Sequence, residues 1–266
     1  LSLHLLELFT SQVAKVGMTD GIRQVLQEES DALRAYYEQA GILIARPAGG
    51  TSCRLAISAK GGTNAENHNH NDVGSYAVAL GSETMVGDQG GPNSYPGDYF
   101  NGDAPQKYKI KGSFGHPVPV VDGRTQSSGG KAKGVVLQKE FTNEKDVFSI
   151  NYTSAYSTPN LDKLIRTFVY DRQGKGSFTV GDEFTAKTPI RFETAITTRA
   201  DWKILDDTHL LLATDSEQMI VAIEASGKVA FTSETIEVNS PAYTRIGIAL
   251  KNQSKEGYIR LKMYTK

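Results

Sequence analysis

Polar and apolar residues alternate in short runs from Gly41 to the end of the chain, and these runs are rich in β-branched and aromatic residues. Successive side chains of a strand point to opposite faces of a sheet, so a period of two predicts strands with one buried face. The turns between the runs, for example residues 171–174 and 225–228, are too short to hold a helical crossover. The pattern therefore predicts a mainly β fold, a large antiparallel β-sandwich over residues 41–266. We expect strands at residues 42–46, 54–58, 75–80, 118–122, 134–141, 147–152, 164–170, 177–180, 191–198, 210–214, 219–224, 229–232, 245–250 and 258–264.

Residues 1–40 carry the one helical pattern of the chain. Apolar residues recur at spacings of three and four from Leu1 to Val16 and again from Ile22 to Tyr37, as on one stripe of a helix. Two such short helices cannot bury both stripes alone, so we expect them to be the end of a larger helical domain. The first residue is leucine and no signal peptide is recognisable, which indicates a piece of a longer precursor.

Composition argues against several classes of protein. The chain has 29 Lys and Arg against 30 Asp and Glu, a formal net charge of −1, whereas nucleic-acid binders show a basic surplus. Cys53 is the one cysteine, so an internal disulfide and a cysteine-based zinc ribbon are both excluded. No apolar run approaches the roughly 20 residues that a membrane-spanning helix needs. We therefore expect neither a nucleic-acid partner nor a membrane span.

The run from Asn67 to Asp72 is the strongest local signal, because it contains two of the five histidines. In an extended strand, His68 and His70 would present their imidazoles on the same face. There they can converge on a metal ion or on one substrate group. The alternative is a polar turn that happens to contain two histidines. The scarcity of histidine elsewhere favours a functional site.

Two further residues complete a candidate metal site. Asp88 ends a short apolar segment, and His116 precedes the strand predicted at residues 118–122. Two imidazoles and one carboxylate suit zinc and leave a fourth position for water. The alternatives are that Asp88 caps a turn and that His116 is an ordinary surface residue. The spacing alone leaves these alternatives open.

A basic and aromatic stretch lies between these motifs. Lys107, Lys109 and Lys111 alternate, so in an extended conformation they would share one face suited to carboxylates or sulfates of a ligand. The alternative is a solvated, lysine-protected edge strand. Tyr95 and Tyr99 can stack on sugar rings or serve as packing. Our candidates for substrate binding are Asn67, Lys107, Lys109, Tyr95 and Tyr99.

Three motifs, in this order, resemble those of the heparinase II/III-like polysaccharide lyases. Residues 67–76 are similar to the family's signature, and residues 85–91 to its apolar strand that ends in Asp and Gly. Residues 115–123 resemble its histidine-containing segment before a Val-Asp-Gly turn. The resemblance covers about residues 41–125.

The resemblance implies a fold and a site. The family joins an N-terminal α/α toroid to C-terminal β-sandwich sheets, with the active site between them. This chain would be the end of the toroid followed by the sandwich. By the same resemblance His68, next to Asn67, faces the substrate. His70, Asp88 and His116 become the ligands of one structural divalent ion, zinc, with calcium or manganese as alternatives.

The resemblance also implies an activity, the cleavage of a uronic-acid-containing polysaccharide such as a glycosaminoglycan or alginate by β-elimination. It places the protein in the periplasm or outside the cell. The family's catalytic tyrosine belongs to the toroid, so we expect this chain alone to fold without catalysing. Two alternatives are a non-catalytic carbohydrate-binding sandwich stabilised by a metal and a cupin-type metal enzyme. Gly62 and His68-x-His70 fit the opening of the cupin motif, but no glutamate follows at the expected position.

Overall fold

The computed structural model of the protein describes residues 32–66, 68–87, 91–92, 94–237 and 242–266. All strand pairings among these residues are antiparallel, in four sheets. The largest sheet has eight strands in the spatial order β14 (Asp201–Asp206), β15 (His209–Ala213), β16 (Gln218–Ala225), β19 (Ser254–Thr265), β12 (Ser177–Ile190), β11 (Leu161–Asp171), β10 (Lys145–Asn151) and β9 (Val135–Phe141).

The other three sheets are smaller. A five-stranded sheet has the order β1 (Arg34–Tyr37), β2 (Ile42–Ala45), β3 (Leu55–Lys60), β5 (Tyr76–Leu80) and β6 (Glu83–Val86). A four-stranded sheet has the order β17 (Val229–Ile236), β18 (Tyr243–Leu250), β13 (Phe192–Thr198) and β7 (Val120–Val121). The last sheet pairs β4 (Thr63–Asn64) with β8 (Gly129–Lys133). The short helices of the described residues are α3 (Ala104–Lys107), η1 (Ser113–Gly115) and η2 (Thr153–Ala155).

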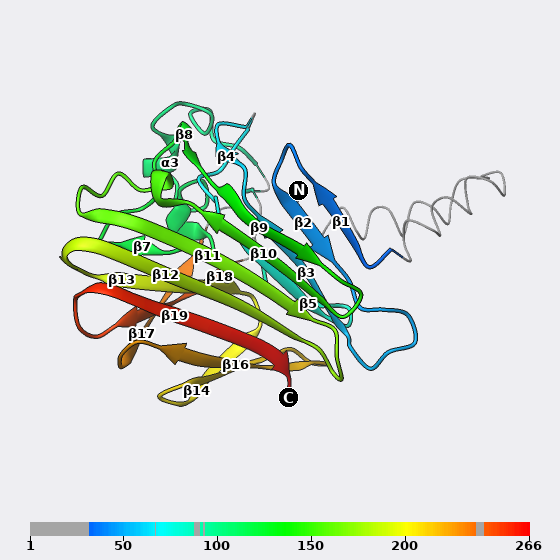
Figure 1. The fold of residues 1–266 in the computed structure, drawn as a ribbon. Coiled ribbons are helices and arrows are strands. Elements are labelled where there is room, and N and C mark those ends of the chain that lie inside the picture. Colours follow the sequence, from blue (N-terminus) through cyan, green and yellow to red (C-terminus); the bar gives the residue numbers. More distant parts are fainter. Residues whose placement is uncertain (1–31, 67, 88–90, 93, 238–241) are drawn as a thin grey trace, which may run out of the picture.

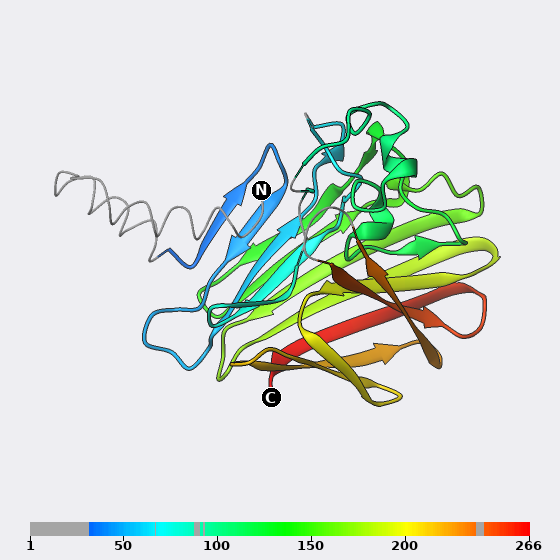
Figure 2. The ribbon, with the colours of Figure 1, turned by 180° about the vertical axis from the view of Figure 1, so that it is seen from behind.

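The five-stranded and four-stranded sheets cover one face of the eight-stranded sheet (Figure 1), as the view from behind also shows (Figure 2). Aromatic side chains join the layers: the rings of Tyr76 and Phe168 lie 6.2 Å apart, and those of Phe184 and Phe192 lie 4.6 Å apart. One continuous hydrophobic core runs through all three sheets. The segment with β4, β8 and α3 lies at one end of the sandwich (Figure 1).

The prediction of a mainly β, antiparallel fold is confirmed, and every predicted strand is present. The strand predicted at residues 177–180 is too short, because β12 continues to Ile190. The helix predicted to continue to Tyr37 is wrong at its end, because Arg34–Tyr37 pair with Ile42–Ala45 as strand β1. The strands β4, β6, β8 and β14 were not predicted. Residues 1–31 of the predicted helical segment lie outside the described residues. Within the described part of the chain, no helix is long and apolar enough to cross a membrane.

Phe168 is at the centre of the core. Its ring stacks between those of Phe148 and Phe178, at centroid distances of 5.9 Å and 6.1 Å and interplanar angles of 14° and 3°. Replacing Phe168 by alanine should lower the free energy of unfolding by about 3–5 kcal/mol, because the surrounding sheets cannot close the resulting cavity. Leu137→Ala, at a site on β9 that is 53% exposed, should change it by less than about 0.5 kcal/mol. Urea denaturation of the two variants provides the comparison, and equal losses would contradict this packing.

Candidate functional site

The two histidines of the strongest sequence motif lie in the loop between β4 and β5, not in a strand. His68 has φ of +56°, in the left-handed region that non-glycine residues rarely adopt. The amide of Asn69 donates to the carbonyl of Glu66 across this turn. The expectation that His68 and His70 share one strand face is therefore wrong. The two rings have different neighbours: Phe100 for His68, and Tyr99 and His116 for His70. Such strained positions cluster at functional sites, which motivates a functional role for His68.

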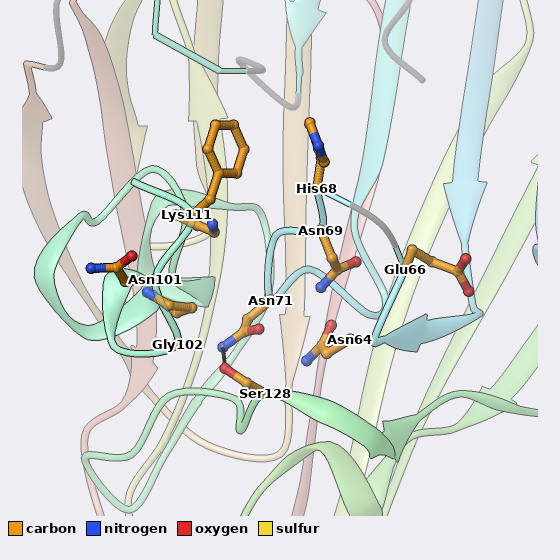
Figure 3. A pocket seen from close by; sticks show the side chains of 11 residues that line it. Asn64, Glu66, His68, Asn69, Asn71, Asn101, Gly102, Lys111 and Ser128 are labelled. Carbon is orange, nitrogen blue, oxygen red and sulfur yellow. Dashed lines mark hydrogen bonds between the residues drawn. The ribbon is translucent and has the colours of Figure 1, made fainter. Parts of the chain in front are cut away.

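His68 borders an open cavity of ≈ 320 Å³ at the end of the sandwich. Its exposed ring lies 4.6 Å from that of Phe100, measured between centroids. Figure 3 shows that His68 and Lys111 lie on the same cavity, together with several amide side chains. The cavity is lined by Asn64, Glu66, His68, Asn69, Asn71, Phe100, Asn101, Gly102, Pro105, Lys111 and Ser128. It is thus a polar site with one lysine, one glutamate, one histidine and one exposed phenyl ring.

His70 faces a different neighbourhood, in which it meets His116. The two imidazole centroids lie 5.2 Å apart. His116 is 1% exposed, and its Nε2 donates a hydrogen bond to the carbonyl of Ile110 at 3.0 Å. In the neutral form of this ring, the lone pair is then on Nδ1. Nε2 of His70 lies 3.1 Å from the hydroxyl of Tyr99. The structure therefore brings together two of the three residues predicted to bind a metal.

The third predicted ligand, Asp88, and the predicted substrate contact Asn67 lie outside the described residues. Among the residues that the structure does describe, no group of three His, Cys, Asp or Glu side chains is arranged to hold an ion. The predicted triad is therefore not tested. The two imidazoles suit a metal ion. His116 is buried, its Nε2 is bonded to a carbonyl oxygen, and His70 lies beside it. Histidine ligands of metals usually have such a supporting oxygen on their second ring nitrogen.

The prediction that three lysines share one face is wrong. Lys107 ends helix α3 and pairs with Asp98, while Lys109 pairs with Glu234. Lys111 has a third environment, in which its ammonium group donates a hydrogen bond to the carbonyl of Tyr99. Lys111 alone of the three lines the cavity.

Lys111 is 6% exposed, and burial lowers the pKa of its ammonium group. Its Nζ lies 4.8 Å from the ring centroids of both Tyr99 and Phe100. A cation held in a poorly solvated place gains more from an anionic partner than a surface lysine does. The ammonium group of Lys111 therefore suits a carboxylate or a sulfate group, while Glu66 adds a negative charge to the lining of the same cavity.

The candidate aromatic residues differ in accessibility. Tyr95 is 57% exposed and packs against Tyr99 and Phe100, with centroid distances of 5.1 Å to each. Tyr99 is 1% exposed, so its ring does not stack on a ligand, and it acts instead through its hydroxyl near His70. Phe100, 48% exposed beside His68, is the ring on the cavity itself.

Gln126 is a site residue that sequence reasoning missed. Its side chain is buried and accepts hydrogen bonds from Asn64 and from the amide of Val73 at 3.0 Å and 3.1 Å. It also donates to the carbonyl of Val73 at 2.7 Å. The loop between β4 and β5, which we call the histidine loop, is thereby held at both ends by the side chain of Gln126. No local pattern around Gln126 indicates this role, because its partners are distant in sequence.

No protein-family model matches the chain, and no curated protein matches its sequence. Solved structures do match it. Heparan sulfate lyase HepC from Pedobacter heparinus superposes with a TM-score of 0.73 and 14% identity over 99% of this chain and 42% of that chain. Heparinase III superposes with a TM-score of 0.69 and 16% identity over 87% of this chain and 36% of that chain. The chain has the fold of the C-terminal part of heparinase III.

A heparinase III gene product designated BT4657 gives a similar result, with a TM-score of 0.71, 12% identity and coverage of 99% of this chain and 41% of that chain. The chain thus spans 36% to 42% of the length of these three heparinase chains. At this low identity the likeness establishes a shared heparinase III fold. The resemblance first indicated by the sequence motifs is confirmed at the level of the fold.

Proposed function

We propose that this chain is the β-sheet part of a polysaccharide lyase that cleaves a uronic-acid-containing polysaccharide by β-elimination. The observation that carries the proposal is the cavity in which His68 and the buried Lys111 lie together, at one end of a heparinase III fold. The solved structures that share this fold are named for heparinase and heparan sulfate lyase activity. We also propose a periplasmic or secreted location, because a polysaccharide is too large to enter a cell unaided.

β-Elimination requires three events at the uronate. A base removes the proton at C5, an acid protonates the departing O4, and positive or hydrogen-bonding groups neutralise the carboxylate so that the C5 proton becomes acidic. In our proposal the imidazole of His68 contacts the carboxylate or shares the proton transfer, and Lys111 supplies positive charge. Asn69 and Asn101 line the same cavity and present amides suited to sugar hydroxyls. Phe100 offers a surface for a sugar ring.

In our proposal the tyrosine that acts as catalytic base lies outside this chain. Tyr76 is 2% exposed, and burial raises the pKa of its hydroxyl well above the usual value, so it does not supply a phenolate. Tyr108 donates its hydroxyl to Asp98, and this hydrogen bond raises its pKa as well. Neither tyrosine lines the cavity. We therefore propose that an α/α toroid of the same protein supplies the base and that the isolated chain does not catalyse.

We propose His70, Asp88 and His116 as the ligands of one divalent ion, zinc by preference for its nitrogen ligands. The ion would act structurally, as an electrostatic crosslink between the segments that carry its ligands. His116 keeps Nδ1 as the basic nitrogen because Nε2 bonds to Ile110. Binding of His70 to the ion would fix the backbone of the histidine loop at that point. His68 is two residues away, so its position would be fixed as well.

Two alternatives to a lyase are a non-catalytic carbohydrate-binding sandwich and a cupin-type enzyme. A non-catalytic carbohydrate-binding sandwich would use the same cavity and the same Lys111, so the fold does not separate it from the lyase. A cupin-type enzyme receives no support from the three structures described above, which are named for heparinase III and heparan sulfate lyase.

The decisive experiment is an assay of the full-length protein on uronate polysaccharides, including heparan sulfate and alginate. A lyase generates an unsaturated uronate at each cut, which absorbs in the ultraviolet. Rising absorbance with falling chain length supports the lyase. Binding of oligosaccharides without any unsaturated product would instead favour the carbohydrate-binding alternative.

Lys111 provides a test of binding on this chain alone. Lys111→Met should weaken the affinity for an anionic uronate oligosaccharide about 10- to 100-fold, since a hydrogen bond to a charged group contributes about 1.5–3 kcal/mol. Lys262→Met, on the exposed part of β19, is the control and should leave the affinity unchanged. Isothermal titration calorimetry measures both variants, with circular dichroism to verify folding. Equal affinities of a folded Lys111→Met and the wild type would remove Lys111 from the site.

A further inference from the structure

Arg166, in the middle of β11, has no exposed surface, yet all five of its N–H donors have acceptors. Nε and Nη2 donate to the two carboxylate oxygens of Asp182 at 2.8 Å and 2.7 Å. Nη2 also donates to the hydroxyl of Thr194 at 3.0 Å. Nη1 donates to the carbonyls of Gly74 at 2.6 Å and Pro117 at 2.8 Å. One guanidinium group therefore joins two sheets and two loop segments.

The two carbonyls belong to the segments that carry the predicted metal ligands. Gly74 lies at the end of the loop with His68 and His70, and Pro117 directly follows His116. Both carbonyls accept from the same nitrogen, so the distance between these backbone points is limited by the reach of one NH₂ group. Gly74 has φ of +88°, and a Cβ there would lie 3.3 Å from the ring of Tyr152, so the close approach requires glycine.

Asp182 holds the guanidinium group in place from the other side. Its carboxylate accepts hydrogen bonds from the hydroxyls of Tyr152 at 2.6 Å and Thr194 at 2.7 Å. The ion pair is buried on both sides, with side-chain exposures of 0% and 1%. A buried ion pair adds little net stability over apolar packing, but it fixes geometry because each lost bond leaves a buried polar group unsatisfied. The main effect of this ion pair is therefore to fix the orientation of the guanidinium group, not to add net stability.

We propose that Arg166 is a positioning residue that sets His70 and His116 at their mutual distance, by holding the carbonyls of Gly74 and Pro117 on one nitrogen. The proposal deepens the proposed function, because these imidazoles are the ones assigned to the ion. It concerns ring placement in the chain itself and is therefore testable without activity. Lysine cannot replace arginine here, since an ammonium has three donors and lacks the planar fork that meets a carboxylate with two bonds.

The test compares Arg166→Lys with Arg172→Lys. Arg172 is a matched control: its side chain is 3% exposed and pairs with the buried Asp146. It donates to the carbonyls of Arg46 and Leu33, which belong to neither histidine segment. Both variants should lose stability in urea. Only Arg166→Lys should change the ring ¹⁵N signals of His70 and His116 in metal-free protein, including a loss of the single tautomer of His116. Co²⁺ affinity should fall about 10- to 100-fold in Arg166→Lys alone, the range typical of supporting residues around metal ligands.

A milder variant keeps the proposal testable if Arg166→Lys does not fold. Tyr152→Phe removes one bond to Asp182 and retains the guanidinium group. It should shift the same two histidine signals by a smaller amount. Native ring signals in a folded Arg166→Lys, or in Tyr152→Phe where Arg166→Lys is unfolded, would overturn the proposal. If the wild type binds no Co²⁺, the metal site fails, while the ring signals still decide the role of Arg166.

Discussion

Replacing His68 by alanine in the full-length protein should lower kcat/KM on a uronate polysaccharide about 10²- to 10⁴-fold, the usual contribution of a group that transfers a proton or stabilises charge. The reason is its position: the exposed ring borders the cavity with Lys111 and is held beside Phe100 by a left-handed backbone turn. The initial rate of ultraviolet absorbance gives kcat/KM. Metal content and thermal unfolding of the same preparation show whether anything other than catalysis changed.

The control for this prediction is His209→Ala. His209 lies on β15, where its Nδ1 is 3.0 Å from the carboxylate of Asp206, and it does not line the cavity. This variant should keep full turnover. If His68→Ala loses the ion together with activity, the roles assigned to His68 and His70 are exchanged. If it retains full activity, His68 has no role in the reaction.

Replacing His116 by alanine should abolish stoichiometric zinc and remove the stabilisation that the ion provides. An ion that binds only the folded protein stabilises it by RT ln(1 + [L]/Kd), about 2.7 kcal/mol at a hundredfold excess over Kd. Excess chelator should therefore lower the Tm of the wild type and leave the Tm of His116→Ala unchanged. Because each protein is compared with itself, with and without chelator, the stabilisation by the ion is distinguished from the stability lost with the hydrogen bond to Ile110.

Elemental analysis and differential scanning calorimetry give the two readouts. His209→Ala should behave as the wild type in both. Unchanged zinc content in His116→Ala, or a wild-type Tm that does not respond to chelator, would contradict the metal site. His70→Ala should give the same result as His116→Ala if both rings bind one ion.

The three lysines and β1 show where a local pattern fails. Leu33 and Tyr37 have helical spacing, but Arg34–Tyr37 gain backbone hydrogen bonds from β2, and this tertiary pairing overrides the local preference. Lys107, Lys109 and Lys111 alternate as in a strand, yet Pro105 near the start of α3 and the pairing of Lys107 with Asp98 put the segment in a helix and a turn. Short segments carry too few residues for a period to be diagnostic.

For the fold, the sequence alone determined the antiparallel strands. Side-chain alternation is a local property of each strand, and it survives whatever the strand pairs with. The order of the three motifs also identified the heparinase III fold, which the solved structures confirm.

For the site, only the tertiary structure decided which residues meet. The placement of His70 beside His116, and of His68 beside Lys111 instead, depends on backbone turns and on contacts between distant segments. Arg166 and Gln126 make these contacts with buried carbonyls and amides, and neither residue stands out in its own strand or loop. The physical reason is that a buried polar side chain is defined by the partners that surround it, and those partners come together only when the sheets pack.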